Sequence, residues 1–224
     1  MSGRTQAMKC LSSWSGGKDG CLALYQALQA GHKISHLVNF ISKKYKRVRF
    51  HGTEAELIQL QAKALGLPLL QNETEDDDYE PAFKKAVKSL LPHNIRGMIF
   101  GDIYIQEHKD WVERVCRELG IKALEPLWGK LPEKVLREFF NAGFEAVIIS
   151  ADSKLIAEKW VGRKVDKGFI KYLKDRELDP CGEKGEYHTL VVNGPIFRKK
   201  IKISRSKPIL REGYWYLDTI EYTL

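Results

Sequence analysis

The chain has 224 residues, of which 43% are hydrophobic and 29% charged, enough for one large domain or one domain with a smaller partner. Its formal net charge of +8 suits anionic ligands and leaves both nucleotides and RNA open. No apolar run approaches the ~20 residues of a membrane span, and residues 1–7 lack the apolar segment of a signal peptide, so we expect a cytoplasmic protein. The scattered cysteines argue against a zinc cluster, a redox pair or a disulfide framework.

The first half of the chain alternates between strand and helix patterns. Short apolar runs predict buried strands at 9–14, 34–42, 68–71, 97–102 and 122–126. Apolar positions at helical spacing predict helices at 21–30, 53–65, 81–91 and 111–119. Thr53 and Glu56 have the spacing of a capping box, and Pro81 suits the first position of a helix. This alternation predicts an α/β fold with a doubly wound parallel sheet.

The pattern changes from Leu127 onwards. Helices are predicted at 132–142, 153–161 and 166–174, and strands at 145–150, 187–192, 196–204, 208–210 and 214–224. We therefore expect a smaller C-terminal α+β domain, with residues 1–126 forming one domain and residues 127–224 the other. The sequence leaves a homo-oligomer open.

The segment Ser15-Gly16-Gly17-Lys18-Asp19-Gly20 separates the first strand from the first helix. Adjacent glycines reach backbone angles that other residues avoid, and the exposed amides at a helix N-terminus form a site for an anion. Lys18 adds a positive charge, and Asp19 adds a carboxylate that either holds Mg²⁺ or caps the helix. The spacing differs from the phosphate loop of the common NTPases. An ordinary turn is the alternative, but the Ser, Lys and Asp favour phosphate binding.

Further polar residues belong to the predicted strands or follow them. Ser13 ends the first strand and Asn39 lies on the second, so both are candidates for holding a nucleoside. Asp102 follows a later strand, at the edge of the sheet where ligands bind in open α/β folds. The basic run 43–49 and the acidic run 73–80 are typical of solvated loops.

A second dense motif is Cys181-Gly182-Glu183-Lys184-Gly185-Glu186-Tyr187-His188-Thr189. Its two glycines bend the chain, and a carboxylate stands on each side of the second bend. The alternation of a strand after this bend would place Glu186 and His188 on one face, and Tyr187 and Thr189 on the other. A solvated hairpin turn fits the same spacing.

Together these motifs resemble the diphthine–ammonia ligase family of PP-loop ATP pyrophosphatases, which split ATP between its α- and β-phosphates. Residues 15–20 are similar to the loop Ser-Gly-Gly-x-Asp-Ser, with Gly20 in place of the last Ser. Residues 182–197, which end in Gly-Pro-Ile-Phe, resemble the family's C-terminal signature. The family's internal motifs resemble residues 50–53, 101–103 and 125–128. The resemblance implies a PP-loop ATPase domain of the HUP type (adenine nucleotide alpha hydrolase-like) joined to a small C-terminal domain.

The resemblance also implies a reaction. A substrate carboxylate attacks ATP to give an acyl-adenylate, and ammonia converts it to an amide with release of AMP and pyrophosphate. In diphthamide biosynthesis the carboxylate belongs to diphthine on elongation factor two. The expected ATP-binding residues, with Mg²⁺ as cofactor and its ligands unassigned, are Ser13, Ser15, Gly16, Gly17, Lys18, Asp19, Gly20 and Asn39.

Four residues are expected to be catalytic: Lys18, Asp19, Glu183 and Glu186. The two glutamates would either bind a cationic substrate group or orient ammonia, and a general-base role requires a raised pKa. The residues expected to line the substrate site are His51, Asp102, Glu183, Glu186, His188 and Thr189. Free ammonia is the expected nitrogen source.

Three other interpretations stay open. His188 stands where the branch best linked to diphthamide tends to carry Glu, and a sister branch is associated with cobalamin salvage, so a small-molecule carboxylate is an alternative substrate. A tRNA-modifying PP-loop enzyme is suggested by the seven basic residues within 198–211, but such a run is more often a solvated face and the catalytic cysteine pairs are missing, so we expect no nucleic-acid partner. Because position 20 lacks the usual Ser, a protein that binds nucleotides without catalysing a reaction is the third interpretation.

Overall fold

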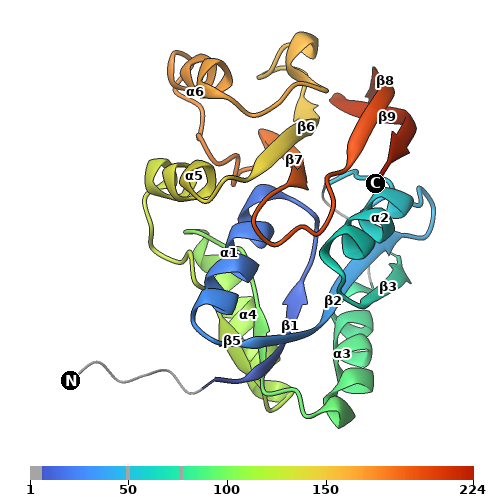
Figure 1. The fold of residues 1–224 in the computed structure, drawn as a ribbon, viewed down its shortest axis with the longest axis vertical. Helices are drawn as coiled ribbons and strands as arrows, with labels where there is room; N and C mark the ends of the chain where they lie inside the picture. Colours follow the sequence, from blue (N-terminus) through green and yellow to red (C-terminus); the bar gives the residue numbers. More distant parts are fainter. Residues whose placement is uncertain (1–6, 49–50, 76–77) are drawn as a thin grey trace.

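The computed structural model describes residues 7–48, 51–75 and 78–224. Two sheets organise these residues, and Figure 1 shows the C-terminal sheet above the N-terminal one. Among the described residues, no helix is both long and apolar enough to span a membrane. The parts of the predicted runs and motifs that fall on residues 1–6, 49–50 and 76–77 lie outside the described residues.

The first sheet is parallel throughout, with the strand order β3-β2-β1-β4-β5. Its strands are β1 (Lys9–Ser13), β2 (Lys33–Ser42), β3 (Leu69–Thr74), β4 (Gly97–Ile99) and β5 (Lys122–Leu124). The helices between them are α1 (Lys18–Gln29), α2 (Ala55–Leu65), α3 (Tyr79–Leu90), the 3₁₀ helix η2 (Leu91–His93) and α4 (Gln106–Glu118). The chain moves outward from β1 to β3 and returns to β4 on the other side of β1. This confirms the predicted doubly wound α/β class and puts its switch point between β1 and β4.

The second sheet is antiparallel, with the order β7-β6-β9-β8. Its strands are β6 (Glu145–Asp152), β7 (Tyr187–Asn193), β8 (Lys202–Arg211) and β9 (Tyr214–Thr223). The helices of this part are α5 (Pro132–Asn141), the 3₁₀ helix η3 (Glu158–Trp160) and α6 (Lys167–Lys174). An antiparallel sheet with helices confirms the α+β character of the C-terminal part. The division at residue 126 stays a prediction.

Two apolar clusters cover the two faces of the first sheet. One contains Leu11 and Met98 and packs against α3 and α4. The other contains Cys10 and Leu37, packs against α1 and α2, and continues into the second sheet at Leu190. The C-terminal part therefore shares a core with the first sheet, and the same cluster holds the second sheet against the side of the N-terminal part that carries α1 and α2. All four cysteines are buried and free.

The starts of two helices differ from the sequence-based prediction. Glu54, not Thr53, is the N-cap of α2, and no side chain accepts a bond from that turn. The Glu54 carboxylate instead accepts from Arg47 and from the amide of Thr219, so tertiary contacts replace the capping box. Helix α3 begins at Tyr79, which makes Pro81 its third residue. The acidic run is correspondingly not a loop throughout, because its ends belong to β3 and α3.

Two C-terminal elements also differ. The predicted helix at 153–161 is a series of turns followed by η3, because Asp152 Oδ1 accepts a bond from the Lys154 amide and closes a local turn. The strands predicted at 196–204 and 208–210 are one strand, β8, preceded by an irregular segment. Pro208 does not interrupt β8 because this strand lies at the edge of its sheet, where a missing amide hydrogen is tolerated.

Candidate active site

A cavity of roughly 890 Å³ lies at the carboxyl ends of β1 and β4 and extends to β7 and β9. Most of the residues predicted from the sequence line it. These residues are Ser13, Ser15, Gly17, Lys18, Asp19, Gly20, Asn39, His51, Asp102, Glu183, His188 and Thr189. The fold therefore brings the two sequence motifs to one site, although more than 160 residues separate Lys18 from Cys181.

The loop before α1 has the backbone that its glycines allow. Gly16 has φ +82°, and a Cβ added there would lie 2.6 Å from Ile58 and 2.8 Å from Gln61. Gly17 is the extended N-cap of α1, so the helix starts at Lys18 and Asp19 lies in its first turn. The alternative that Asp19 caps the helix is therefore wrong. Lys18, Asp19 and Gly20 in the first turn of α1 line the cavity, so this helix N-terminus is placed for an anion, although the Lys18 amide already donates to Thr189.

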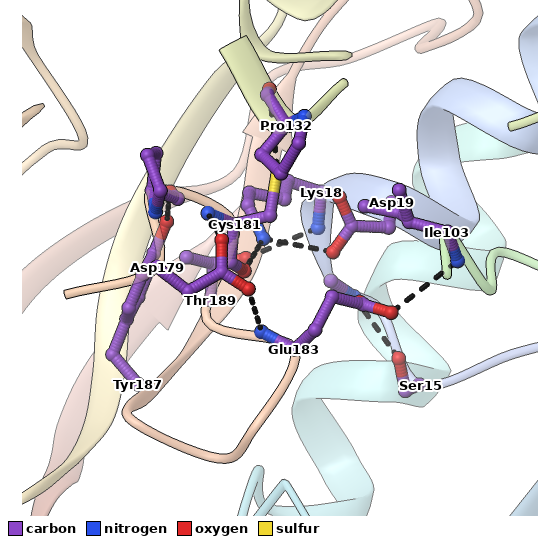
Figure 2. Close-up of polar contacts among 12 residues, drawn as sticks. Ser15, Lys18, Asp19, Ile103, Pro132, Asp179, Cys181, Glu183, Tyr187 and Thr189 are labelled. Atoms are coloured by element: carbon purple, nitrogen blue, oxygen red, sulfur yellow. Dashed lines mark hydrogen bonds and ion pairs between the residues drawn. The ribbon is translucent and has the colours of Figure 1, made fainter. Parts of the chain in front are cut away.

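Lys18 connects this loop to the C-terminal motif. Its ammonium group donates to Asp19 Oδ2 at 2.8 Å and to the carbonyl of Cys181, and it lies 5.1 Å from the centre of the Tyr187 ring. Its backbone amide donates to Thr189 Oγ1 at 3.0 Å. Figure 2 shows these contacts converging on the start of α1. Burial alone would lower the pKa of Lys18, but Asp19 raises it well above its usual value, so this side chain stays charged.

Gln61 of α2 supports the loop before α1 through hydrogen bonds, and sequence reasoning missed it. Its amide nitrogen donates to the carbonyls of Gly16 at 3.0 Å and Val191 at 2.7 Å, and its oxygen accepts from the indole of Trp14 at 2.8 Å. The Val191 amide also donates to Gly16. A fully buried Gln on the apolar face of α2 was the available signal, because such an amide needs partners. The role of Gly16 is thus to join the two motifs from outside the cavity.

The loop that carries Glu183 is held by Asp179. The Asp179 carboxylate accepts from the amides of Cys181 at 2.8 Å and Glu183 at 3.1 Å, and from the hydroxyl of Tyr104. The hydroxyl of Tyr187 donates to the carbonyl of Pro180 at 2.6 Å. These bonds fix the Cys181 carbonyl that meets Lys18 (Figure 2). Sequence reasoning missed Asp179, whose only local signal is that it precedes a proline.

Glu183 reaches the cavity and has an unusual electrostatic environment. One of its carboxylate oxygens accepts from the amide of Ile103 at 3.3 Å. Burial, followed by the nearby charge of Asp19, raises the pKa of Glu183 to about 7, although Lys18 and the Ile103 amide act in the other direction. A carboxyl group that titrates near neutral pH is suited to general acid–base chemistry.

Glu186 does not line the cavity with Glu183. It precedes β7, so the alternation of the strand does not apply to it, and its carboxylate accepts from the amide of Lys184 at 3.1 Å within its own turn. Its side chain is nearly buried and does not line the cavity. The geometry therefore favours Glu183 over Glu186 for chemistry, and the catalytic role predicted for Glu186 has no support from its position.

Asn39 and Asp102 line the cavity with part of their polar groups already engaged. The Asn39 amide donates to the carbonyl of Trp14 at 2.7 Å and its oxygen accepts from Gln71 at 2.9 Å. Asp102 lies 3.2 Å from the ring of His108, and that contact raises the pKa of His108. The nucleoside role of Asn39 and the substrate role of Asp102 stay predictions.

His51 and His188 lie together at one side of the phosphate loop. Their ring centres are 4.4 Å apart, and a Cβ added to Gly17 would lie 3.3 Å from His51 Cε1. Burial lowers the pKa of His188 to about 4, and burial, His188 and Lys18 lower the pKa of His51 well below its usual value. Both rings are therefore neutral at pH 7.

A magnesium ion fits this site if the substrate supplies most of its ligands. The described residues include no group of three or more His, Cys, Asp or Glu arranged to hold a metal. Asp19 Oδ1 is buried and has no partner among them, while Asp19 Oδ2 pairs with Lys18. Because Mg²⁺ is usually bound by one or two carboxylates and by phosphate oxygens, Asp19 is a suitable protein ligand.

Gly101 is a further residue on which the loop depends. A Cβ at this position would lie 2.7 Å from the amide nitrogen of Gly20 and 2.9 Å from the carbonyl carbon of Asp19. We expect Gly101→Ala to displace the start of α1 and to raise the KM for ATP about tenfold, as overpacking typically costs about 1–3 kcal/mol. Gly97→Ala is the matched control on β4, because its Cβ meets Lys122 instead. Steady-state kinetics with equal KM values for both variants would contradict the expectation.

The comparisons with known proteins cover both parts of the chain. The family model for the diphthamide synthase N-terminal domain matches residues 8–123, and the model for the diphthamide synthase C-terminal domain matches residues 131–222. A protein of Schizosaccharomyces pombe named diphthine–ammonia ligase is 31% identical, with 88% of this chain aligned to 36% of that protein. A human protein of the same name is 29% identical, with 92% of this chain aligned to 86% of that protein.

The chain thus spans about a third of its fission-yeast relative and most of its human one. A solved structure described as a predicted subunit of tRNA methyltransferase from Methanocaldococcus jannaschii aligns with a TM-score of 0.45 at 16% identity, covering 86% of this chain and 99% of that one. The fold assignment rests on the strand order itself. Since the N-terminal family model alone matches more than half of the residues, the chain belongs to the diphthamide synthase family.

Proposed function

We propose that this protein is an ATP-dependent ligase that amidates the carboxylate of diphthine with ammonia and releases AMP and pyrophosphate. The observation that carries the proposal is the single cavity in which the phosphate loop and Glu183 meet, joined by the bond from Lys18 to the Cys181 carbonyl. The names of the aligned relatives support the same reaction. The tRNA-modifying and non-catalytic alternatives are not favoured by these relatives.

In the first half-reaction the substrate carboxylate attacks the α-phosphorus of ATP. The loop amides and Lys18 bind the phosphates and stabilise the negative charge of the departing pyrophosphate. Mg²⁺, held in part by Asp19, supplies further charge neutralisation when bound. The ion pair with Asp19 holds the Lys18 ammonium at the start of α1 before substrate arrives.

In the second half-reaction ammonia attacks the carbonyl carbon of the acyl-adenylate, the bond to AMP breaks so that AMP leaves, and the nitrogen loses one proton. Glu183 lies in the cavity and has a pKa of about 7, so its carboxylate accepts a proton from the incoming nitrogen near neutral pH. Each turnover that starts from ammonium releases protons to solvent, and Glu183 returns its share before the next cycle. Diphthine carries a trimethylammonium group, and the negative charge of Glu183 and Asp19 also favours that group in the cavity.

Position 20 has space for the serine side chain that the family pattern has there. A Cβ added to Gly20 would have only Ser13 O within 4 Å, at 3.9 Å, so a serine fits without collision. We expect Gly20→Ser to tighten pyrophosphate binding roughly threefold to tenfold, since a hydrogen bond to a charged group contributes about 1.5 kcal/mol. Product inhibition by pyrophosphate measures this effect. Gly20→Ala is the control, and equal inhibition constants for the two variants would show that the hydroxyl makes no contact.

The reaction itself is tested by incubating the protein with ATP, ammonium and elongation factor two that carries diphthine. The expected products are AMP, pyrophosphate and diphthamide, detected by nucleotide chromatography and peptide mass spectrometry. A parallel incubation with a corrinoid carboxylate tests the small-molecule alternative. AMP release without conversion of diphthine would refute the substrate, and the absence of any ATP cleavage with either substrate would refute the reaction class.

A further inference from the structure

His51 and His188 form a pair of rings beside the phosphate loop, and the mechanism above gives these side chains no role. His51 comes from the segment between β2 and α2, and His188 comes from β7, yet their rings lie 4.4 Å apart and both line the cavity. Neither imidazole forms a hydrogen bond with the described residues, and His51 Nδ1 is buried without a partner. A buried polar nitrogen without a partner is costly, so the pair is built for a group that arrives with the ligand.

The position of the rings indicates what this group is. His51 packs on Gly17, the N-cap residue of α1, and the amide of Lys18 donates to Thr189, the neighbour of His188. The rings therefore border the N-terminus of α1 and the Lys18 ammonium group, both of which attract an anion. A polyphosphate chain bound there offers oxygen acceptors to imidazole N–H groups, and its charge favours the imidazolium form.

We propose that His51 and His188 form a proton-accepting pair that contacts the phosphate chain, and that one of the two rings takes up a proton from solvent when the chain binds. The proposal rests on the proposed ATP site. Without ligand, burial opposes protonation of both rings, and so do Lys18 and, for His51, the ring of His188, whereas bound phosphates bring negative charge that favours protonation. The protonated ring then gives bound polyphosphate a second cation beside Lys18. Because this ring is charged only in the complex, the protein without ligand does not bury that charge.

The other titratable groups around the pair are consistent with this exchange. Those that line the same cavity are Lys18 and Asp19 of α1, Asp102, Glu107 and His108 after β4, Cys181, Glu183 and Lys184 before β7, and Tyr79, Tyr187, Tyr214 and Tyr216. Burial lowers the pKa of Lys18 but Asp19 raises it well above its usual value, so Lys18 stays protonated with or without ligand. Glu183, whose pKa burial raises to about 7, and His108, whose pKa is raised by its hydrogen bond to Asp102, also take up protons when phosphate binds at pH 7, and their share is common to the wild type and the histidine variants.

Proton uptake is measured by titration calorimetry with inorganic pyrophosphate and with the magnesium complex of α,β-methylene ATP. Each titration is repeated at pH 7 in buffers of different ionisation enthalpy. We expect the wild-type protein to take up close to one proton more than His188→Gln or His51→Gln, and the affinity of these variants to fall roughly tenfold with the loss of one charge-assisted bond. The protonation of the ligand itself is common to all variants and cancels in the difference.

A matched control is His36→Gln, because His36 and His93 form a second ring pair, at 5.5 Å, outside the cavity. Nitrogen-detected NMR of the wild-type imidazoles keeps the test independent of whether the variants fold. Both rings staying neutral in the complex, or equal proton uptake by wild type and variants, would overturn the proposal. Failure of α,β-methylene ATP to bind at all would instead refute the ATP site on which the proposed function depends.

Discussion

Lys18→Met is expected to reduce the release of AMP from ATP by about 10²- to 10³-fold, the usual effect of removing one charge that stabilises a transition state. Lys18 is the cation at the start of α1, and its side chain is only 4% exposed, so water does not replace it easily. The same change removes the bond to the Cys181 carbonyl and so loosens the loop that carries Glu183. The rate is measured in single-turnover reactions, which separate cleavage of ATP from product release.

The substitution also leaves Asp19 without its partner. Breaking a buried ion pair by removing one member typically costs about 3–5 kcal/mol, so a loss of activity in Lys18→Met alone is open to a folding explanation. The double variant Lys18→Met with Asp19→Asn removes both charges and is expected to recover much of the midpoint of thermal unfolding. It should not recover AMP release. If activity returned together with stability, Lys18 would have a structural role and no catalytic one.

The sequence predicts the phosphate loop well because its requirements are local. Gly16 needs a positive φ, Gly17 and Lys18 start a helix, and the apolar runs on either side determine the strand and the helix. The parallel sheet also follows from local patterns, since each strand is followed by a helix. These elements form from residues close in the chain, and a single sequence carries that information.

The supports of the site depend on distant contacts and could not be read in the same way. Gln61 joins Gly16 to Val191, which is 130 residues from Gln61 in the chain, and a helix pattern gives no sign of that connection. Glu186 was assigned to a face by the alternation of a strand that begins one residue later. Glu183 and Glu186 look equivalent in the motif, and only the path of the turn, fixed by Asp179, separates their environments.

Glu183→Gln is expected to slow amide formation about 10²- to 10⁴-fold, the usual contribution of general acid–base catalysis, while AMP formation falls much less. In the wild-type protein, kcat/KM for ammonium should rise with pH through about 7, because the carboxylate form accepts the proton and the pKa of Glu183 is raised to that value. The variant should lose this inflection. Quench-flow measurement of acyl-adenylate and amide at several pH values distinguishes the two half-reactions.

The stability of the same variant gives an independent measurement. Because the folded-state pKa of Glu183 is raised, its protonated form stabilises the fold at low pH, and this contribution is lost as pH rises from about 4.5 towards 7 and above. Gln mimics the protonated form, so Glu183→Gln should unfold at a higher temperature than wild type above pH 7 and at a similar one near pH 4. Glu186→Gln is the matched control for the kinetic experiment. Its pH profile of kcat/KM for ammonium is expected to keep the wild-type inflection near pH 7, because the Glu186 carboxylate bonds within its own turn. An inflection that disappears in Glu186→Gln and persists in Glu183→Gln would reverse the assignment of the base and show that the loop rearranges when substrate binds.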